Sequence, residues 1–461
     1  MSRTTRAAAL AATLATALIV ASDTPVASQA TPAAAASSFN VFEQDIADLQ
    51  LALREGRVTS RQLVDQYLAR IAAFDQQGPA VNAFITLNPK AREEADALDA
   101  ERRAGRLRGP LHGIPLAIKD NYLTTGLQTT AGTQALEGFI PTEDAYQVKR
   151  LRAQGVIVLG KTNLHELAAG ITSVSSAGGQ TRNPYDLSRN PGGSSGGTAA
   201  AIAASLAPAG LGTDTCGSIR IPAAHNNLFG LRPTFGLSSR DGIVPLSHSQ
   251  DVGGPLARTT ADLARLLDAT VGYDAADAAT EEGRERIPAT YMEFMGDSSL
   301  IDVHIGVLKP LMGSTDADAE VRTVVSAALE TLDGMGAGVG TVDIKDFDEL
   351  LKDTSTIVHE FKFDLMDFLA QRHAPVHSLD EILRWGLYHT ALDATLRGRN
   401  ETAARETDAY KATREKRETA RKYILETMEG QGLTVLAYPT IRRKAAPVGE
   451  NQEGSNCQLS A

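Results

Sequence analysis

The sequence predicts an α/β fold in which helices cover most of a β-sheet. Two apolar runs, at residues 113–120 and 156–159, have the composition of buried strands, and residues 145–154 between them have a helical pattern. Strands that alternate with helices are typical of sheets covered on both faces. The chain of 461 residues is long enough for a large core, and it contains no internal repeat and no clear linker between folded domains.

The segments before the first strand are predicted to be helical. Apolar side chains recur at helical spacing through residues 39–74. Gly56 interrupts this pattern, and Thr59 is placed to cap a second helix. Residues 91–106 predict a third helix with a charged surface.

The second half of the chain continues the alternation of strand and helix. Residues 303–308 predict a strand, and residues 316–332 predict a helix closed by the glycines at 334, 336, 338 and 340. Residues 402–429 predict a long charged helix, and residues 433–438 predict a late strand. The α/β pattern therefore extends almost to the end of the sequence.

The N-terminus is predicted to be a targeting segment. Arg3 and Arg6 precede an uncharged, mostly apolar run at residues 7–21, and small residues follow. This order is typical of a secretory signal peptide, and the run is too short for a membrane span. We therefore assign residues 1–30 to a signal peptide and residues 31–40 to a linker. The protein is expected to be secreted or periplasmic, with no stable membrane insertion after signal removal.

Charge and cysteine content limit the partners and the covalent framework. The formal net charge of −11 disfavours binding to phosphate backbones, so we expect no nucleic-acid partner. Cys216 and Cys457 are the two cysteines of the chain, which is too few for a disulfide framework. We therefore expect no such framework, although a secretory segment points to an oxidising compartment.

One string matches a phosphate-binding loop but contains unsuitable residues. Residues 155–162 (GVIVLGKT) satisfy the pattern letter for letter. Such a loop needs small, flexible residues so that backbone N–H groups can surround a phosphate, whereas four bulky apolar residues fill this one. The string therefore predicts a buried strand. The rival hypothesis is a nucleotide hydrolase using Lys161, and a lack of nucleotide binding would dismiss it.

Two segments rich in small residues contain candidate nucleophiles. Residues 191–197 (PGGSSGG) satisfy the nucleophile-elbow pattern at Ser194 and again at Ser195. An elbow follows directly on an apolar strand, whereas residues 183–191 contain two prolines and no strand pattern. An α/β-hydrolase-type esterase using Ser194 or Ser195 is therefore the weaker alternative.

The second segment, residues 212–220 (GTDTCGSIR), places Ser218 in a turn of small residues. Successive N–H groups in such a turn can form a nest that receives an oxyanion. A polar turn that joins two buried segments is the competing interpretation of this segment taken by itself.

Together these segments resemble the amidase signature family. The three segments occur in the family's order, beginning with residues 113–120 (GIPLAIKD), and the separation of Ser194 from Ser218, 218 − 194 = 24, is the family's spacing between its catalytic serines. The resemblance covers nearly everything after residue 42. Residues 247–251 (SHSQD) are similar to the bacterial peptide amidase and aryl acylamidase branches.

The resemblance implies a Ser–cis-Ser–Lys triad. Ser218 would be the nucleophile that forms the acyl-enzyme, Ser194 would bridge it to the base after a cis bond from Gly193, and Lys119 would be the general base. A lysine must be desolvated to be neutral near pH 7, and the end of an apolar strand suits that requirement. The residues implied in oxyanion and substrate binding are Thr215, Cys216, Gly217 and Ser218, and those implied in support of the turn are Ser195, Asp214 and Arg220.

For the whole chain, the resemblance implies one large domain, residues 41–461, around a mixed, mostly parallel twisted sheet flanked by helices. The family usually continues beyond a segment like residues 456–461, so the domain is expected to lack its C-terminal strands. The implied activity is hydrolysis of a carboxamide C–N bond to a carboxylic acid plus ammonia or an amine. The implied substrate is a small-molecule amide or peptide amide, with no metal and no organic cofactor. A subunit of a tRNA-dependent amidotransferase is the alternative, and a homodimer is the assembly left open.

Overall fold

The computed structural model describes residues 39–296, 299–342 and 344–460. The signal peptide expected at residues 1–30 lies outside the described residues, together with most of the expected linker, and both stay predictions. The chain from Phe39 onward forms one compact unit. None of the helices that the structure describes is long and apolar enough to span a membrane.

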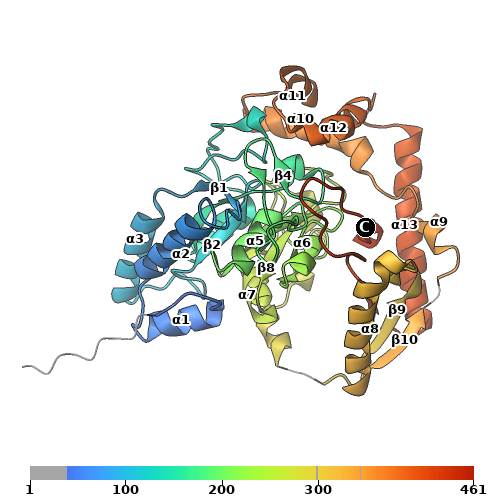
Figure 1. Cartoon of the computed structure of the whole chain (residues 1–461), viewed down its shortest axis with the longest axis horizontal. Coiled ribbons are helices and arrows are strands. Elements are labelled where there is room, and N and C mark those ends of the chain that lie inside the picture. Colours follow the sequence, from blue (N-terminus) through green and yellow to red (C-terminus); the bar gives the residue numbers. More distant parts are fainter. Residues whose placement is uncertain (1–38, 297–298, 343, 461) are drawn as a thin grey trace, which may run out of the picture. The chain divides into compact units, whose positions relative to one another are not determined.

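In the described part of the chain, six strands form the central sheet, in the order β1 (Phe84–Leu87), β3 (Ile157–Thr162), β2 (Pro115–Lys119), β6 (Ala209–Asp214), β8 (Val252–Ala257) and β7 (Phe229–Gly230) (Figure 1). The strands β3, β2 and β6 at the centre are mutually parallel, whereas β1 and β8 are antiparallel to their neighbours. Four strands, β3, β2, β6 and β7, therefore run in one direction. The predicted mixed sheet of an α/β fold is confirmed.

Helices cover this sheet. Their bounds are α1 (Ile46–Arg54), α2 (Ser60–Phe74), α3 (Ala91–Arg103), α4 (Tyr146–Ala153), α5 (Gly196–Ala203), α6 (Arg220–His225) and α7 (Thr260–Thr270). The helix α3 contacts β3, α5 contacts β2 and β6, and α7 contacts β8. As a result, every residue of β2, β3, β6 and β8 is buried.

The predicted elements of the first half are confirmed. The apolar runs at residues 113–120 and 156–159 form β2 and β3, and β3 continues to Thr162, so the phosphate-loop string lies in a strand. Thr59 caps α2, because its side chain accepts the N–H of Gln62 while the Gln62 side chain accepts the N–H of Thr59.

A second, three-stranded parallel sheet follows in the order β10 (Gly338–Val342), β9 (His304–Leu308) and β11 (Val435–Ala437). Its helices are α8 (Ala319–Gly334), α9 (Phe347–Leu351) and α13 (Asp408–Gly430). The strands and helices predicted for this region are confirmed, with two differences. The helix α13 begins at Asp408 rather than at residue 402, because the Thr407 side chain caps it by accepting the N–H of Tyr410. Gly338 and Gly340, expected to follow a helix, lie in β10.

Three helices that the sequence analysis did not assign pack together at the top of Figure 1, namely α10 (Ile357–Gln371), α11 (Leu379–Trp385) and α12 (Asp393–Asn400). A short hairpin, β4 (Val174–Ser175) with β5 (Gly179–Gln180), lies below them in the same view.

After β11 the chain returns to the loop that precedes α5. The N–H of Asn190 donates to Ala446 O at 3.0 Å, and the N–H of Val448 donates to Ser188 O at 2.8 Å. Asn456 Nδ2 donates to Leu311 O at 2.8 Å. This C-terminal segment, residues 440–460, therefore contacts both the central sheet's loops and the region of the second sheet.

Candidate active site

Lys119 occupies the last position of the central strand β2, and its side chain is fully buried. Its Nζ donates hydrogen bonds to Ser194 Oγ and to Thr213 Oγ1, both at 2.7 Å. Thr213 lies in the neighbouring parallel strand β6, which places its hydroxyl beside the end of β2. The structure therefore brings together Lys119 and Ser194, which are 75 positions apart in the sequence.

Burial lowers the pKa of Lys119 to about 7, while the negative charges of Asp214 and Asp251 oppose this shift. An ammonium group loses its hydration inside the protein, so its neutral form is favoured there. A neutral lysine amine can accept a proton from a hydroxyl group. Lys119 is therefore suited to act as a general base near neutral pH.

Ser194 lies in a loop directly before α5, and its peptide bond to Gly193 is cis. Gly192 has a φ of +79°, a conformation that favours glycine. The loop is held from both sides, since Ser173 Oγ donates to Gly192 O at 2.7 Å and the N–H of His165 donates to Ser194 O at 3.0 Å.

The structural context of a nucleophile elbow is not found at Ser194 or Ser195. Among the described residues between β5 and α5, residues 181–195 contain no strand that leads into either serine. Ser195 Oγ is already engaged, because it donates to Thr213 O and accepts the N–H of Thr213, both at 3.2 Å. The geometry therefore does not support the esterase alternative, and it gives Ser195 the supporting contacts that were expected.

Ser218 lies in the turn between β6 and α6, which we call the catalytic turn (residues 214–218). The N–H of Ser195 donates to Ser218 O at 3.1 Å, so the backbone of Ser218 lies beside the residue that follows Ser194. Gly217 has a φ of +104°, and a Cβ there would lie 2.8 Å from Ile221 Cδ1, so the turn requires glycine at this position.

Asp214 organises the catalytic turn from inside. Its carboxylate accepts the N–H of Gly217 at 2.7 Å and the N–H of Ile219 at 3.1 Å, and it forms an ion pair with Arg220 at 3.0 Å. Burial alone would raise the pKa of Asp214, but the positive charges of Arg220 and Arg232 outweigh it and hold the pKa well below its usual range. The contacts expected of Asp214 and Arg220 are therefore present.

The set of oxyanion donors differs from the expected one. The N–H of Gly217 is taken by Asp214 Oδ1, which removes it from the group of free donors. Within the described segments, the N–H groups of Thr215, Cys216 and Ser218 donate to no protein acceptor. These three groups therefore remain available to a bound oxyanion, and Gly217 instead shapes the turn.

Three further residues contact this site, and the sequence analysis assigned a role to none of them. Thr213 Oγ1 accepts from Lys119, as described above, and also from Asn121 Nδ2 at 3.0 Å. Asp251 is buried and accepts the hydroxyl of Thr215, while its other oxygen accepts two backbone N–H groups. Their positions in the sequence could have indicated a role, since Asn121 follows the end of β2 and Thr213 comes near the end of the adjacent strand.

Cys216 and Cys457 form a disulfide, with Cα atoms 4.7 Å apart and 241 positions between them in the sequence. The sequence did not predict this bond, although a single disulfide does not amount to the framework that the cysteine count excluded. The reason is tertiary, because the C-terminal segment returns to the catalytic turn and brings Cys457 against Cys216.

Lys161, the residue of the rejected phosphate-loop string, is fully buried in β3 and pairs with Asp120 at 3.0 Å. Its Nζ also donates to Tyr122 O at 2.7 Å and to Thr129 Oγ1 at 2.8 Å. These partners use the hydrogen-bond donors of the Lys161 ammonium group. The geometry therefore offers no place for a phosphate at Lys161.

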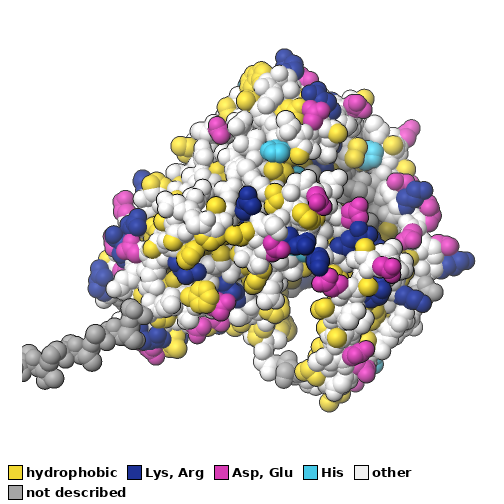
Figure 2. Space-filling model, in the orientation of Figure 1, with side chains coloured by type: hydrophobic (Ala, Val, Ile, Leu, Met, Phe, Trp, Pro, Cys, Tyr) yellow, Lys and Arg dark blue, Asp and Glu magenta, His cyan; other side chains and the backbone are white. Residues whose placement is uncertain are grey.

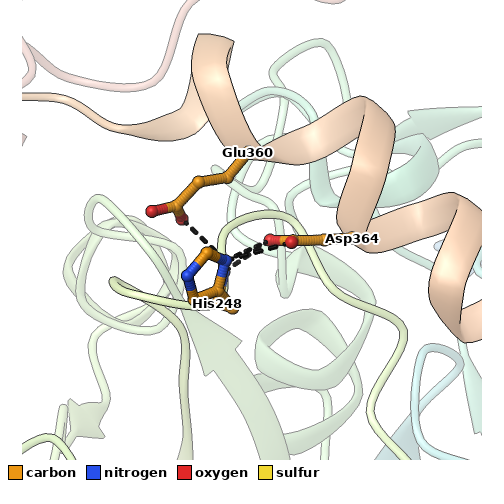
Figure 3. A group of neighbouring side chains, drawn as sticks. All are labelled: His248, Glu360 and Asp364. Atoms are coloured by element: carbon orange, nitrogen blue, oxygen red, sulfur yellow. Dashed lines mark hydrogen bonds and ion pairs between the residues drawn. The ribbon is translucent and has the colours of Figure 1, made fainter. Parts of the chain in front are cut away.

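One group of side chains among the described residues could surround a metal ion by its spacing alone, namely His248, Glu360 and Asp364 (Figure 3). His248 Nδ1 lies 3.0 Å from both Asp364 oxygens and 3.5 Å from Glu360, and the hydrogen bond with Asp364 raises the pKa of His248. Glu360 also accepts the hydroxyls of Ser249 and Tyr410. Protein donors thus already occupy these carboxylates, and the group fastens α10 to the loop that contains Asp251.

A groove passes beside the catalytic turn, between the central part of the chain and α13. Figure 2 shows dark blue side chains on the surface above the hollow that separates the central part of the chain from the part that holds α8. The ionisable lining of the groove is mostly cationic, although the chain as a whole is acidic. These residues are Arg220, Arg232, Arg286, Lys411, Arg414, Arg417 and Arg421, with Glu282, Glu415 and Glu418.

Comparisons with known proteins show what this chain is similar to. The family model described as Amidase matches residues 62–460. The chain is 44% identical over 309 residues to a glutamyl-tRNA(Gln) amidotransferase subunit from Halorhodospira halophila, a match that covers 67% of this chain and 62% of that protein. The chain thus spans less than two thirds of this relative's length.

Solved structures are similar over more of their length. Native peptide amidase from Stenotrophomonas maltophilia is 39% identical with a TM-score of 0.82, covering 91% of this chain and 88% of that one. An amidase family protein from Bacillus anthracis is 31% identical with a TM-score of 0.79, covering 86% and 80%.

Proposed function

The chain belongs to the amidase family, and from this premise we propose that it hydrolyses a carboxamide C–N bond through an acyl-enzyme on Ser218. One observation carries the proposal. The buried Lys119 Nζ lies 2.7 Å from Ser194 Oγ, and the residue after Ser194 is hydrogen-bonded to Ser218. The first contact joins the base to the bridging hydroxyl, and the backbone contact places Ser218 beside this pair.

The reaction begins when neutral Lys119 takes the proton of Ser194 as Ser194 takes that of Ser218. Ser218 Oγ then attacks the amide carbonyl, and the tetrahedral oxyanion is received by the N–H groups of Thr215, Cys216 and Ser218. The proton returns through Ser194 to the leaving nitrogen, which departs as ammonia or an amine. Water, deprotonated along the same path, releases the carboxylic acid and restores Ser218.

The proposed substrate is a small-molecule amide or a peptide amide. One of the similar solved structures, which covers 91% of this chain at 39% identity, is that of a peptide amidase, and it supports an amide of this kind without defining its acyl group. Secretion or export to the periplasm is proposed as well. The Cys216–Cys457 disulfide supports this location, because disulfides persist in oxidising compartments.

A second candidate is a subunit of a tRNA-dependent amidotransferase. Curated relatives have that name, and the cationic groove beside the catalytic turn could attract an acidic partner despite the net charge of −11. Cell fractionation separates the candidates. An exported chain that turns over simple amides without partner subunits supports the amidase, and a cytosolic chain that is inactive alone supports the amidotransferase.

Labelling of the nucleophile tests the mechanism. A fluorophosphonate should modify the peptide that contains Ser218, as identified by mass spectrometry. Ser218→Ala should abolish the label and lower turnover on the order of 10⁶-fold. Ser195→Ala is the matched control, because Ser195 lies in the same loop as Ser194 but makes only supporting contacts. Label on Ser194 or Ser195, with Ser218→Ala still active, would overturn the assignment.

A further inference from the structure

The Cys216–Cys457 disulfide connects the catalytic turn to the C-terminal segment. Cys216 lies directly between Thr215 and Gly217, inside the turn that offers N–H groups to the oxyanion. Cys457 lies near the end of the described chain, 241 positions later. The disulfide therefore joins the catalytic turn covalently to a distant segment of the chain.

Apart from the disulfide, Cys216 has fewer contacts that hold it in place than the other residues of the catalytic turn. The Thr215 hydroxyl donates to Asp251, the Gly217 N–H donates to Asp214, and Ser218 O accepts from Ser195. By contrast, in the part of the chain that the structure describes, no hydrogen bond of Cys216 accompanies the disulfide. The disulfide is therefore the contact that fixes Cys216.

We propose that the Cys216–Cys457 disulfide positions the N–H of Cys216 for the oxyanion, so that amide hydrolysis depends on the oxidation state of this cysteine pair. The inference rests on the proposed function. The disulfide is reduced by a dithiol, which supplies both electrons and both protons. Its thiolate attacks one sulfur and breaks the S–S bond, and its second thiol closes a cyclic disulfide on the reductant. Cys216 and Cys457 are left as two thiols.

Both cysteines are half-buried, so a small dithiol can reach the bond. The protein should remain folded after reduction, because other contacts hold the C-terminal segment. Asn456 Nδ2 donates to Leu311 O at 2.8 Å and to Pro439 O at 2.6 Å, and residues 446–448 are bonded to the loop before Ser194. Reduction should therefore release only the region around Cys216 and leave the rest of the fold unchanged.

Reduction is expected to lower kcat, but by less than the removal of an oxyanion donor would. Removal of one oxyanion donor lowers kcat by roughly 10²- to 10³-fold, and here the donor is displaced rather than removed. The reduced enzyme should therefore have a kcat lower by on the order of 10-fold, with a smaller change in KM. The pH profile should keep its midpoint, because the bond between Lys119 and Ser194 does not involve the disulfide.

The experiment compares the oxidised full chain, the same protein treated with dithiothreitol, and the reduced protein after reoxidation. Kinetics on one amide substrate are recorded with melting temperature and circular dichroism at each stage. We expect a fall in kcat on reduction at a temperature where the fold is intact, and recovery on reoxidation. Cys457→Ser should match the reduced protein and should not respond to dithiothreitol. Ser455→Ala, in the same segment, should keep both the activity and the response.

Equal kcat for oxidised and reduced protein, with free thiols verified by alkylation, would overturn the inference. A loss that tracks unfolding, or a changed pH midpoint with unchanged kcat, would also overturn it. Failure of the proposed function gives a different result, because the oxidised protein would then neither hydrolyse amides nor acquire a fluorophosphonate label on Ser218.

Discussion

The pH dependence of catalysis tests the role of Lys119 most directly. Burial lowers the pKa of Lys119 from 10.5 to about 7, a difference that corresponds to roughly 5 kcal/mol in favour of the neutral amine. About half of Lys119 is then neutral at pH 7, compared with about 1 in 3,000 for a lysine at its ordinary pKa. Because the neutral form is the base, activity should rise with pH and level off above about pH 8.

The assay is kcat/KM measured from pH 5 to pH 10 on an uncharged amide, so that substrate ionisation does not contribute. Lys119→Arg should be inactive across this range, because a guanidinium stays charged. Asp251→Asn should move the midpoint to lower pH, because the negative charge of Asp251 raises the pKa of Lys119. Asp367→Asn is the matched control, since the Asp367 side chain is half-buried and pairs with Arg405.

A profile that still rises about tenfold per pH unit between pH 7 and pH 9 would refute this reasoning, because it would place the base at an ordinary lysine pKa. Near-normal rates for Lys119→Arg would refute it as well. An unchanged midpoint in Asp251→Asn would show that the charge of Asp251 does not act on Lys119.

Three further predictions concern the surroundings of the base. Ser194→Ala should lower kcat far more than Ser195→Ala, since only Ser194 contacts the base, and comparable losses in steady-state kinetics would contradict this assignment. Arg220→Met should lower the free energy of unfolding by about 3 kcal/mol, as measured in urea, because it removes a partner of the buried Asp214 carboxylate; an unchanged urea midpoint would argue against this support. Lys119→Met should abolish turnover and raise Tm, because a buried amine with a lowered pKa destabilises the fold below its ordinary pKa. In the parent, stability should rise with pH between about 7 and 10.5, and this slope should vanish in the variant.

The features of this fold that can be predicted from the sequence are local ones. The apolar run at residues 113–120 and the capping residue Thr59 were assigned correctly, because strand composition and caps depend on neighbouring residues. The start of α13 was placed too early, since a charged surface pattern continues past the true cap at Thr407. The helices α10 to α12 were not assigned.

The sequence by itself determined which residues to examine, namely Lys119, Ser194 and Ser218. Their types, their order and the spacing of 24 between the serines are properties of the chain alone. It also determined that the string containing Lys161 is a strand, because bulky apolar residues cannot form a phosphate loop.

Only the tertiary structure decided how these residues act on one another. The pairing of β2 with β6 brings Thr213 to Lys119, and the return of the C-terminal segment joins Cys457 to Cys216 across 241 positions. It also committed the Gly217 N–H to Asp214. Such contacts depend on which buried surfaces pack together, and the local preferences of residues so far apart in the chain do not specify that packing.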